Sequence, residues 1–417
     1  MAEGRTTPTQ LAEEALARAN GNAGRNTYLW RNPEWTMTEA ARAEGMQRSQ
    51  GGAFGDGRPG LWGLPVSLKD CFDLAGTPTS CGVEFYRNIH GVATRDSWLV
   101  EQLRTAGAVI TGKTHLHPLA YGITGENPEF GDCRIPGRPD ALTGGSSSGA
   151  AASVVEGSAM AAIGTDTGGS VRAPAALCGL AGYRATIGRG DWRGAGQLAQ
   201  SFDTMGWLFR DLRDAPLLAA PFAPELGQER HPLMRFAVTD ESFLEDCEPE
   251  ILTSFRNGVS ELAALDLKEA TVDVSWWRDA FEVFAPIQAW EAARIHAGHF
   301  AHFEDAIRER LEWGAQISDE EIATLRGRHA GFLARMDALF AEHDVLLVPA
   351  TPTARLAADA DHSQTRRRML RYTVPFSLAG VPVVTVPCSA GGIQMAAARG
   401  SDEDLLALAA RMGAMRD

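Results

Sequence analysis

The sequence lacks the features that direct a chain into a membrane or out of the cell. Its first ten residues, MAEGRTTPTQ, contain no apolar segment of the kind found in a secretory signal. No stretch reaches the ~18 uncharged apolar residues that span a bilayer. The six cysteines are scattered and form no C-x-x-C pair. We therefore expect reduced thiols in a cytoplasmic protein without membrane attachment.

Positive charge is also scarce. The chain has 39 Lys and Arg against 53 Asp and Glu, a formal net charge of −14. The one notable basic run is the Arg-Arg-Arg at residues 366–368, which is too short to form a nucleic-acid patch. We expect no nucleic-acid partner. The 44% hydrophobic and 22% charged content is ordinary for a globular protein that buries a large core.

The histidines do not form a recognisable metal-binding pattern. His296, His299 and His302 recur every three residues, so on a helix their side chains would fan over a broad arc. No carboxylate accompanies them at a known ligand spacing. His115 and His117 are interpreted as loop or pocket-wall residues. We expect no metal ion and no cofactor.

Short apolar strands alternate with amphipathic segments through much of the chain. The patterns predict helices at 10–19, 38–47, 97–106, 150–155, 319–342 and 402–412, and strands at 66–68, 108–111, 159–165, 345–348 and 381–386. Residues 276–313 are helical in pattern and rich in aromatics. This alternation predicts an α/β fold, a single large α/β/α sandwich with a mixed, mostly parallel central sheet covered by helices.

No internal repeat or convincing change of composition divides the chain. We therefore predict one domain over residues 1–417, with 221–227 as the best candidate for an internal loop boundary. Within that domain we distinguish N-terminal helices at 1–60, a core at 61–215, a helical and aromatic-rich pocket wall at 230–345, and closing strands with a C-terminal helix at 346–417.

The most informative stretch is the glycine- and serine-rich segment 144–172, GGSSSGAAASVVEGSAMAAIGTDTGGSVR. Its charged residues are Glu156, Asp166 and Arg172. Glycine lets the backbone turn tightly and approach a ligand closely. Buried hydroxyls, in turn, need hydrogen-bonding partners. The segment therefore indicates a buried loop system built around hydroxyl groups and not a solvated linker.

Two serines of this segment are candidate nucleophiles. Ser170 follows two glycines, so its Oγ can be exposed while the preceding N–H groups surround an oxyanion. The alternative is a simple turn in which Ser170 caps a helix beginning near Arg172. Ser147 fits the G-x-S-x-G elbow of α/β-hydrolases, but no hydrophobic strand precedes it and no suitable histidine follows it.

Lys69 ends a short apolar strand. Burial lowers the pKa of a lysine, and the neutral amine is a usable general base. The alternative is a surface turn formed by Lys69 and Asp70.

Together these segments resemble the amidase signature family. The resemblance rests on PVSLKD at 65–70, GGSS at 144–147 and GTDTGGSVR at 164–172. It extends to GAVITGKT at 107–114, TGENP at 124–128, SFDTMG at 201–206 and the closing strand at 381–387. The chain departs from the family pattern at His115, Pro118 and residues 184–186, and none of these is Lys69, Ser146 or Ser170.

The resemblance implies a mechanism. It makes Ser170 the nucleophile, neutral Lys69 the base, and Ser146, in a cis peptide, the proton relay between them. The implied oxyanion hole consists of the backbone N–H groups of Thr167, Gly168, Gly169 and Ser170. We also expect substrate contacts from Tyr121, Gly122, Thr143, Gly144 and Gly145.

The expected activity is cofactor-free hydrolysis of a C–N bond through an acyl-enzyme on Ser170. The substrate is expected to be a small molecule: an amide, or else a carbamate (urethane), an anilide or an ester. The aromatics of 276–303 suggest an apolar or aryl group. The alternative is the glutaminase (A) subunit of a tRNA-dependent amidotransferase complex. A homodimer is left open, and a non-catalytic protein is disfavoured because all three catalytic positions are intact.

Overall fold

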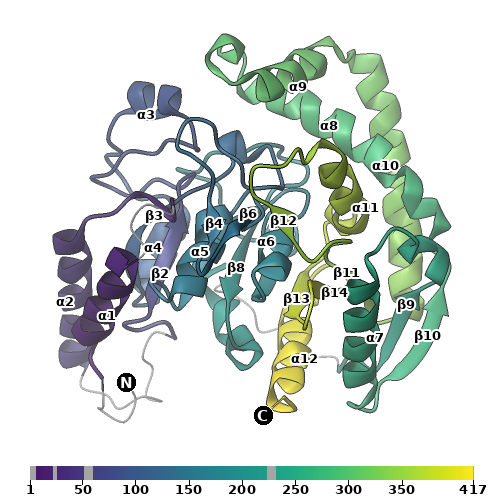
Figure 1. The fold of residues 1–417 in the computed structure, drawn as a ribbon, viewed down its shortest axis with the longest axis horizontal. Coiled ribbons are helices and arrows are strands. Elements are labelled where there is room, and N and C mark those ends of the chain that lie inside the picture. Colours follow the sequence, from purple (N-terminus) through teal and green to yellow (C-terminus); the bar gives the residue numbers. More distant parts are fainter. Residues whose placement is uncertain (1–5, 22–25, 51–59, 223–231, 417) are drawn as a thin grey trace.

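The computed structural model describes residues 6–21, 26–50, 60–222 and 232–416, and all that follows concerns these residues. A long twisted sheet runs through the molecule, with α1 (Pro8–Gly21) and α2 (Pro33–Gln50) at one end (Figure 1). A layer of helices built from α8, α9 and α10 rises at the other end (Figure 1). In the described part of the chain, no helix is both long and apolar enough to cross a bilayer.

Among the described residues, eleven strands form the main sheet in the order β1-β3-β2-β6-β8-β7-β13-β14-β11-β9-β10. Strands β3, β2 and β6 pair in parallel, as do β11, β9 and β10. The pairs from β6 through β8, β7, β13 and β14 to β11 are antiparallel, as is the pair of β1 and β3. The predicted α/β class with a mixed sheet is confirmed, and the parallel pairs lie in two blocks separated by an antiparallel centre.

The strands of this sheet are short and mostly buried. Their bounds are β1 Tyr28–Trp30, β2 Pro65–Lys69, β3 Val109–Thr114, β6 Ala161–Asp166, β7 Ala181–Arg184, β8 Thr204–Phe209, β9 Arg235–Thr239, β10 Lys268–Val272, β11 Val345–Pro349, β13 Val383–Pro387 and β14 Gly392–Ala397. A small second sheet contains β4 (Arg134–Ile135), β5 (Arg138–Leu142) and β12 (Leu356–Ala357).

Helices pack on the sheet and on one another. Helix α5 contacts β2, β3, β6 and β8, whereas α6 contacts β7, β13 and β14, and α8 contacts α9, α10 and α11. The remaining bounds are α3 Glu84–His90, α4 Trp98–Thr105, α5 Ser148–Glu156, α6 Arg172–Leu177, α7 Pro249–Ala263, α8 Ala280–Ile295, α9 Asp305–Gln316, α10 Asp319–Glu342, α11 Ser363–Ala379 and α12 Asp402–Ala414. Short 3₁₀ turns include η1 Pro118–Ala120 and η6 Phe300–His302.

Capping explains why some boundaries follow the sequence closely. The Ser318 hydroxyl accepts a hydrogen bond from the Glu321 N–H at 3.2 Å, so α10 begins where the pattern predicts it. The helical region predicted at 276–313 is interrupted instead. Helix α8 ends at Ile295, and Gly298, at φ 84°, turns the chain before α9. The predicted boundary loop 221–227 lies mostly outside the described residues.

Candidate active site

Two neighbouring parallel strands bring Lys69 to the glycine- and serine-rich loops. Strands β2 and β6 are paired in parallel register, so Lys69 at the end of β2 lies beside the end of β6. Its side chain is fully buried. Lys69 Nζ lies 2.8 Å from Ser146 Oγ and 2.7 Å from Thr165 Oγ1. The two residues that we expect to act as base and relay are thus in direct contact.

Burial dominates the electrostatics of Lys69. Desolvation lowers the pKa of its ammonium to about 8, and the more distant carboxylates of Asp166 and Asp203 only partly oppose that effect. A surface turn at this point is wrong, because Asp70 is also buried and pairs with Lys113, whose Nζ lies 2.6 Å from Asp70 Oδ1. A neutral amine is therefore accessible near physiological pH.

The two Gly/Ser loops are fastened together by Ser147. Its N–H donates to the Ser170 carbonyl at 3.2 Å, and its hydroxyl contacts both the N–H (3.3 Å) and the carbonyl (3.2 Å) of Thr165. The side chain of Ser147 is fully buried. The preceding strand, β5, belongs to the small second sheet. Ser147 therefore serves as a connector, and the elbow interpretation is not supported.

Ser146 follows a cis peptide bond from Gly145, as the family resemblance implies. The hydroxyl of Ser146 contacts Lys69. Ser170 lies in the neighbouring loop, which Ser147 joins to the Ser146 loop, and it lines a small pocket. Within the described residues, no direct hydrogen bond joins the Ser146 and Ser170 hydroxyls. Hydrogen bonds of this kind often tighten only when substrate binds.

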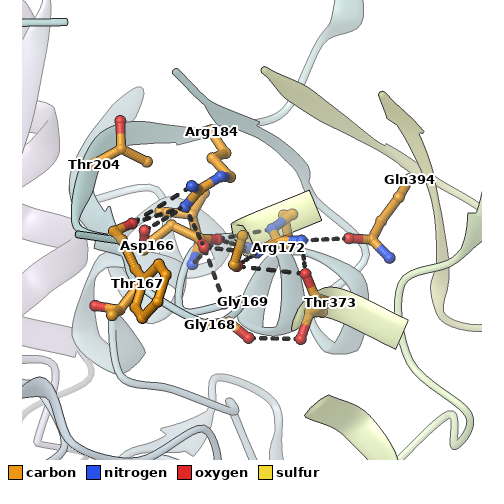
Figure 2. A network of polar contacts seen from close by, with 12 residues as sticks. Asp166, Thr167, Gly168, Gly169, Arg172, Arg184, Thr204, Thr373 and Gln394 are labelled. Atoms are coloured by element: carbon orange, nitrogen blue, oxygen red, sulfur yellow. Dashed lines mark hydrogen bonds and ion pairs between the residues drawn. The ribbon is translucent and has the colours of Figure 1, made fainter. Parts of the chain in front are cut away.

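Asp166 fixes the loop that carries Ser170 (Figure 2). Its carboxylate accepts hydrogen bonds from the N–H groups of Gly169 and Val171 at 2.9 and 3.1 Å, and from the guanidinium of Arg172 at 2.8 Å. Arg184 Nη1 lies 3.1 Å from the same carboxylate. Burial would raise the pKa of Asp166, but the two guanidinium groups outweigh it and hold the pKa well below its usual range.

This arrangement bears on the four backbone N–H groups that we expect to form an oxyanion hole. The N–H of Gly169 donates to Asp166 Oδ1, so it is not free to face a ligand. In the described part of the chain, no acceptor is paired with the N–H of Thr167, Gly168 or Ser170. Within the described residues the N–H groups of Thr167, Gly168 and Ser170 are unpaired, whereas that of Gly169 is paired with Asp166, and the expected oxyanion hole stays a prediction.

Contacts from distant segments hold the same loop. Thr373 Oγ1 on α11 donates to the Gly168 carbonyl at 2.5 Å, and Thr167 Oγ1 donates to Asp203 Oδ1 at 2.6 Å (Figure 2 shows the Thr373 contact). Gly169 has φ 124°, and a Cβ there would meet the Thr373 side chain at 2.8 Å. Glycine is therefore required at 169 by both conformation and space.

A small pocket, here called the Ser170 pocket, opens beside these donors. Its volume is about 20 Å³, and its lining residues are Ala120, Tyr121, Gly122, Ile123, Thr167, Gly168, Ser170, Gln288, Arg366 and Leu370. The expectation that Tyr121 and Gly122 lie at the site agrees with this lining.

Thr143, Gly144 and Gly145, which we expected to contact substrate, are not among the lining residues. The Thr143 hydroxyl donates to the Cys133 carbonyl at 3.1 Å, and the Gly145 N–H donates to the Ile123 carbonyl at 2.8 Å. A Cβ on Gly144 would meet Leu177 at 2.7 Å. The polar groups of Thr143 and Gly145 and the space beside Gly144 are thus used in shaping the loop before Ser146, and a contact of these residues with substrate stays a prediction.

Five pocket residues were missed by the sequence analysis: Ala120 and Ile123 on either side of Tyr121 and Gly122, Gln288 on α8, and Arg366 and Leu370 on α11. Residues 366–368 did stand out as a basic run, but nothing in the run indicates that one arginine faces Ser170. Among the aromatics of 276–303, Phe284 approaches the loop, since a Cβ on Gly168 would lie 3.0 Å from its ring. Trp277 is buried in the core.

The histidines of 296–302 belong to an aromatic cluster. His296 Nδ1 lies 2.6 Å from the Tyr86 hydroxyl, and the His302 ring stacks on Phe85 at 4.0 Å. The described residues contain no group of three or more His, Cys, Asp or Glu side chains placed to hold a metal ion.

Comparison with known proteins identifies the family of the chain. The family model named Amidase matches residues 11–406. The indoleacetamide hydrolase of Pseudomonas savastanoi is 32% identical over 83% of this chain and 82% of its own. The glutamyl-tRNA(Gln) amidotransferase (A) subunit of Chromohalobacter salexigens is 30% identical over 96% of this chain and 91% of its own. A crystal structure of an amidase superposes with a TM-score of 0.87, at 31% identity, over 99% of this chain and 97% of its own.

The fold and these similarities define an amidohydrolase, an enzyme that acts on carbon–nitrogen bonds. The chain belongs to the amidase signature family.

Proposed function

We propose that the protein hydrolyses a small-molecule amide through an acyl-enzyme on Ser170, with Ser146 and Lys69 as the proton relay. The observation that carries this proposal is the contact of the buried Lys69 Nζ with Ser146 Oγ at 2.8 Å, in a loop fastened to the Ser170 loop. A lysine whose pKa is lowered by burial can accept a proton at neutral pH, which a surface lysine cannot do.

The proposed reaction has two halves. Ser170 Oγ bonds to the acyl carbon while its proton passes to Ser146, whose own proton passes to Lys69. The N–H groups of Thr167, Gly168 and Ser170 stabilise the oxyanion. The C–N bond then breaks, the leaving nitrogen takes a proton back through the relay, and an ester on Ser170 remains. Water attacks this ester by the same relay and releases the acid and Ser170.

The proposed reaction does not restrict the leaving group or the acyl group to those of a simple amide. Carbamates (urethanes), anilides and esters undergo the same two-step reaction, so all belong in a substrate screen. The 30% identical amidotransferase relative supports the glutaminase alternative. Co-purification with a second subunit, together with glutaminase activity only in its presence, would favour that alternative over an independent amidase.

A serine-reactive probe tests the assignment. A neutral fluorophosphonate should label one serine, and peptide mass spectrometry should locate the adduct at Ser170. In Ser147→Ala the adduct should still form at Ser170, because Ser147 connects the loops and does not attack. An adduct on Ser147 in the unaltered protein would restore the elbow interpretation, and no labelling at all would refute the acyl-enzyme.

The pH dependence tests the role of Lys69. Since the base must be neutral, we expect kcat/KM to fall about tenfold per pH unit as the pH drops below about 8. Burial raises the pKa of Asp203 to about 6, so a second loss should begin there as Asp203 becomes protonated and stops accepting from Thr167.

Comparing the pH profiles of the unaltered enzyme and of Asp203→Asn separates the two losses of kcat/KM. In Asp203→Asn the lower step should disappear while the upper one stays. A rate that is flat or rises from pH 8 to pH 5 would contradict the role of Lys69 as base.

A further inference from the structure

Two arginines from different helices meet at the Ser170 pocket. Arg366 on α11 lines it together with Ser170. Arg310 on α9 lies over the ring of Tyr121, another lining residue, at 4.5 Å from the ring centre, and donates to the Tyr121 carbonyl. The pocket that holds the nucleophile therefore has a cationic wall.

Neither arginine is neutralised within the protein. In the described part of the chain, no carboxylate lies within ion-pair distance of Arg366 or Arg310, and Arg366 Nε is buried without a hydrogen-bond partner. Other arginines of α11 differ: Arg367 lies 2.8 Å from Glu282, and Arg371 lies 3.4 Å from Asp246. The arginine that faces the pocket is thus left unpaired on a helix whose other arginines have acidic partners.

The surroundings reinforce the need for an anion. Burial lowers the pKa of Arg366 to about 10, and the neighbouring charge of Arg310 contributes to that lowering. Burial, and then these two guanidinium groups, hold the pKa of His117 well below its usual range, so His117 adds no charge of its own. Burying a cation without a partner is costly, and a carboxylate that accepts two parallel hydrogen bonds from a guanidinium compensates for it well.

We propose that the Ser170 pocket selects short amides that carry a carboxylate, and that Arg366 binds this carboxylate with Arg310 beside it. This inference rests on the proposed amidase function and names its substrate class. Arg366 and Ser170 line the same small pocket, so the link between the carboxylate and the scissile carbonyl must be short. Monoamides of small dicarboxylic acids have such a link and carry the carboxylate.

Succinamate and butanamide, which differ in the carboxylate, provide the test. For the unaltered enzyme we expect kcat/KM for succinamate to exceed that for butanamide by about 100-fold or more. Arg366→Met should lower the succinamate value by a similar factor, mainly through KM, and lower the butanamide value by a much smaller factor, so that the preference for succinamate is lost. Arg367→Met, one position along the same helix, is the matched control and should leave both values unchanged.

A second measurement needs no variant. Succinate should inhibit butanamide hydrolysis competitively in the unaltered enzyme, and failure to inhibit would overturn the inference. Equal turnover of the two amides, with the Ser170 adduct still formed, would overturn the carboxylate preference and leave the amidase function intact. Absence of both the adduct and any Ser170-dependent turnover would overturn the proposed function, and this inference with it.

Discussion

Ser170→Ala is expected to lower kcat by at least about 10⁴-fold on any amide that the enzyme hydrolyses, because no other hydroxyl can form the acyl-enzyme. The loop itself should survive. The hydrogen bonds that hold it run through the backbone of residues 169 and 171 to Asp166 and do not involve the Ser170 side chain. Steady-state ammonia release, with circular dichroism to verify the fold, measures the effect.

The matched control for this variant is Ser153→Ala. Ser153 is a fully buried serine of the same segment that lies on α5 and does not line the pocket. Its hydroxyl contacts Ser67 Oγ at 2.8 Å. We expect it to retain activity within about tenfold while losing some stability. Turnover by Ser170→Ala near that of the unaltered enzyme would remove Ser170 from the mechanism.

Asp166→Ala is expected to lower the free energy of unfolding by about 3–5 kcal/mol, a large part of the total stability of a typical domain. The substitution leaves the guanidinium groups of Arg172 and Arg184 without their carboxylate, and both side chains are fully buried. Arg172 keeps its contacts with the Thr373 carbonyl at 2.8 Å and Gln394 at 2.7 Å, which accept hydrogen bonds but carry no neutralising charge (Figure 2).

Urea unfolding followed by tryptophan fluorescence measures this loss. Asp344→Ala is the control, since Asp344 pairs with the exposed Arg235 at 2.6 Å, and exposed pairs contribute about 1 kcal/mol or less. A loss below about 1 kcal/mol in Asp166→Ala would show that the buried charge cluster does not stabilise the fold. Activity should fall as well, because Asp166 also holds the Gly169 N–H.

The candidate catalytic centre could be predicted because each of its residues lies in a short segment with a recognisable sequence. Lys69 ends a strand that is apolar in sequence, and the glycines around Ser146 and Ser170 mark loops with unusual backbone needs. The helices at 97–106 and 319–342 were also predictable, since Ser97 and Ser318 cap them locally. Such features depend on residues a few positions apart.

Other expectations concern backbone or side-chain donors that have more than one possible acceptor. Gly169 was expected to face an oxyanion, but the carboxylate of Asp166 is near enough to take its N–H. Thr143 and Gly145 were expected to contact substrate, but they bond to Cys133 and Ile123. Sequence patterns show that a donor exists, whereas the choice among competing acceptors depends on distances that only the folded chain sets.

The sequence by itself determined the family, the α/β class and the positions of Lys69, Ser146 and Ser170, because motif, strand and loop are local properties. The tertiary structure decided what faces Ser170. Gln288 and Arg366 reach the pocket because α8 and α11 pack together and over the Ser170 loop, far along the chain from Ser170. The sequence does not show which way an arginine of a basic run points. The packing of α11 turns Arg366 toward Ser170, and no carboxylate of the described residues pairs with it.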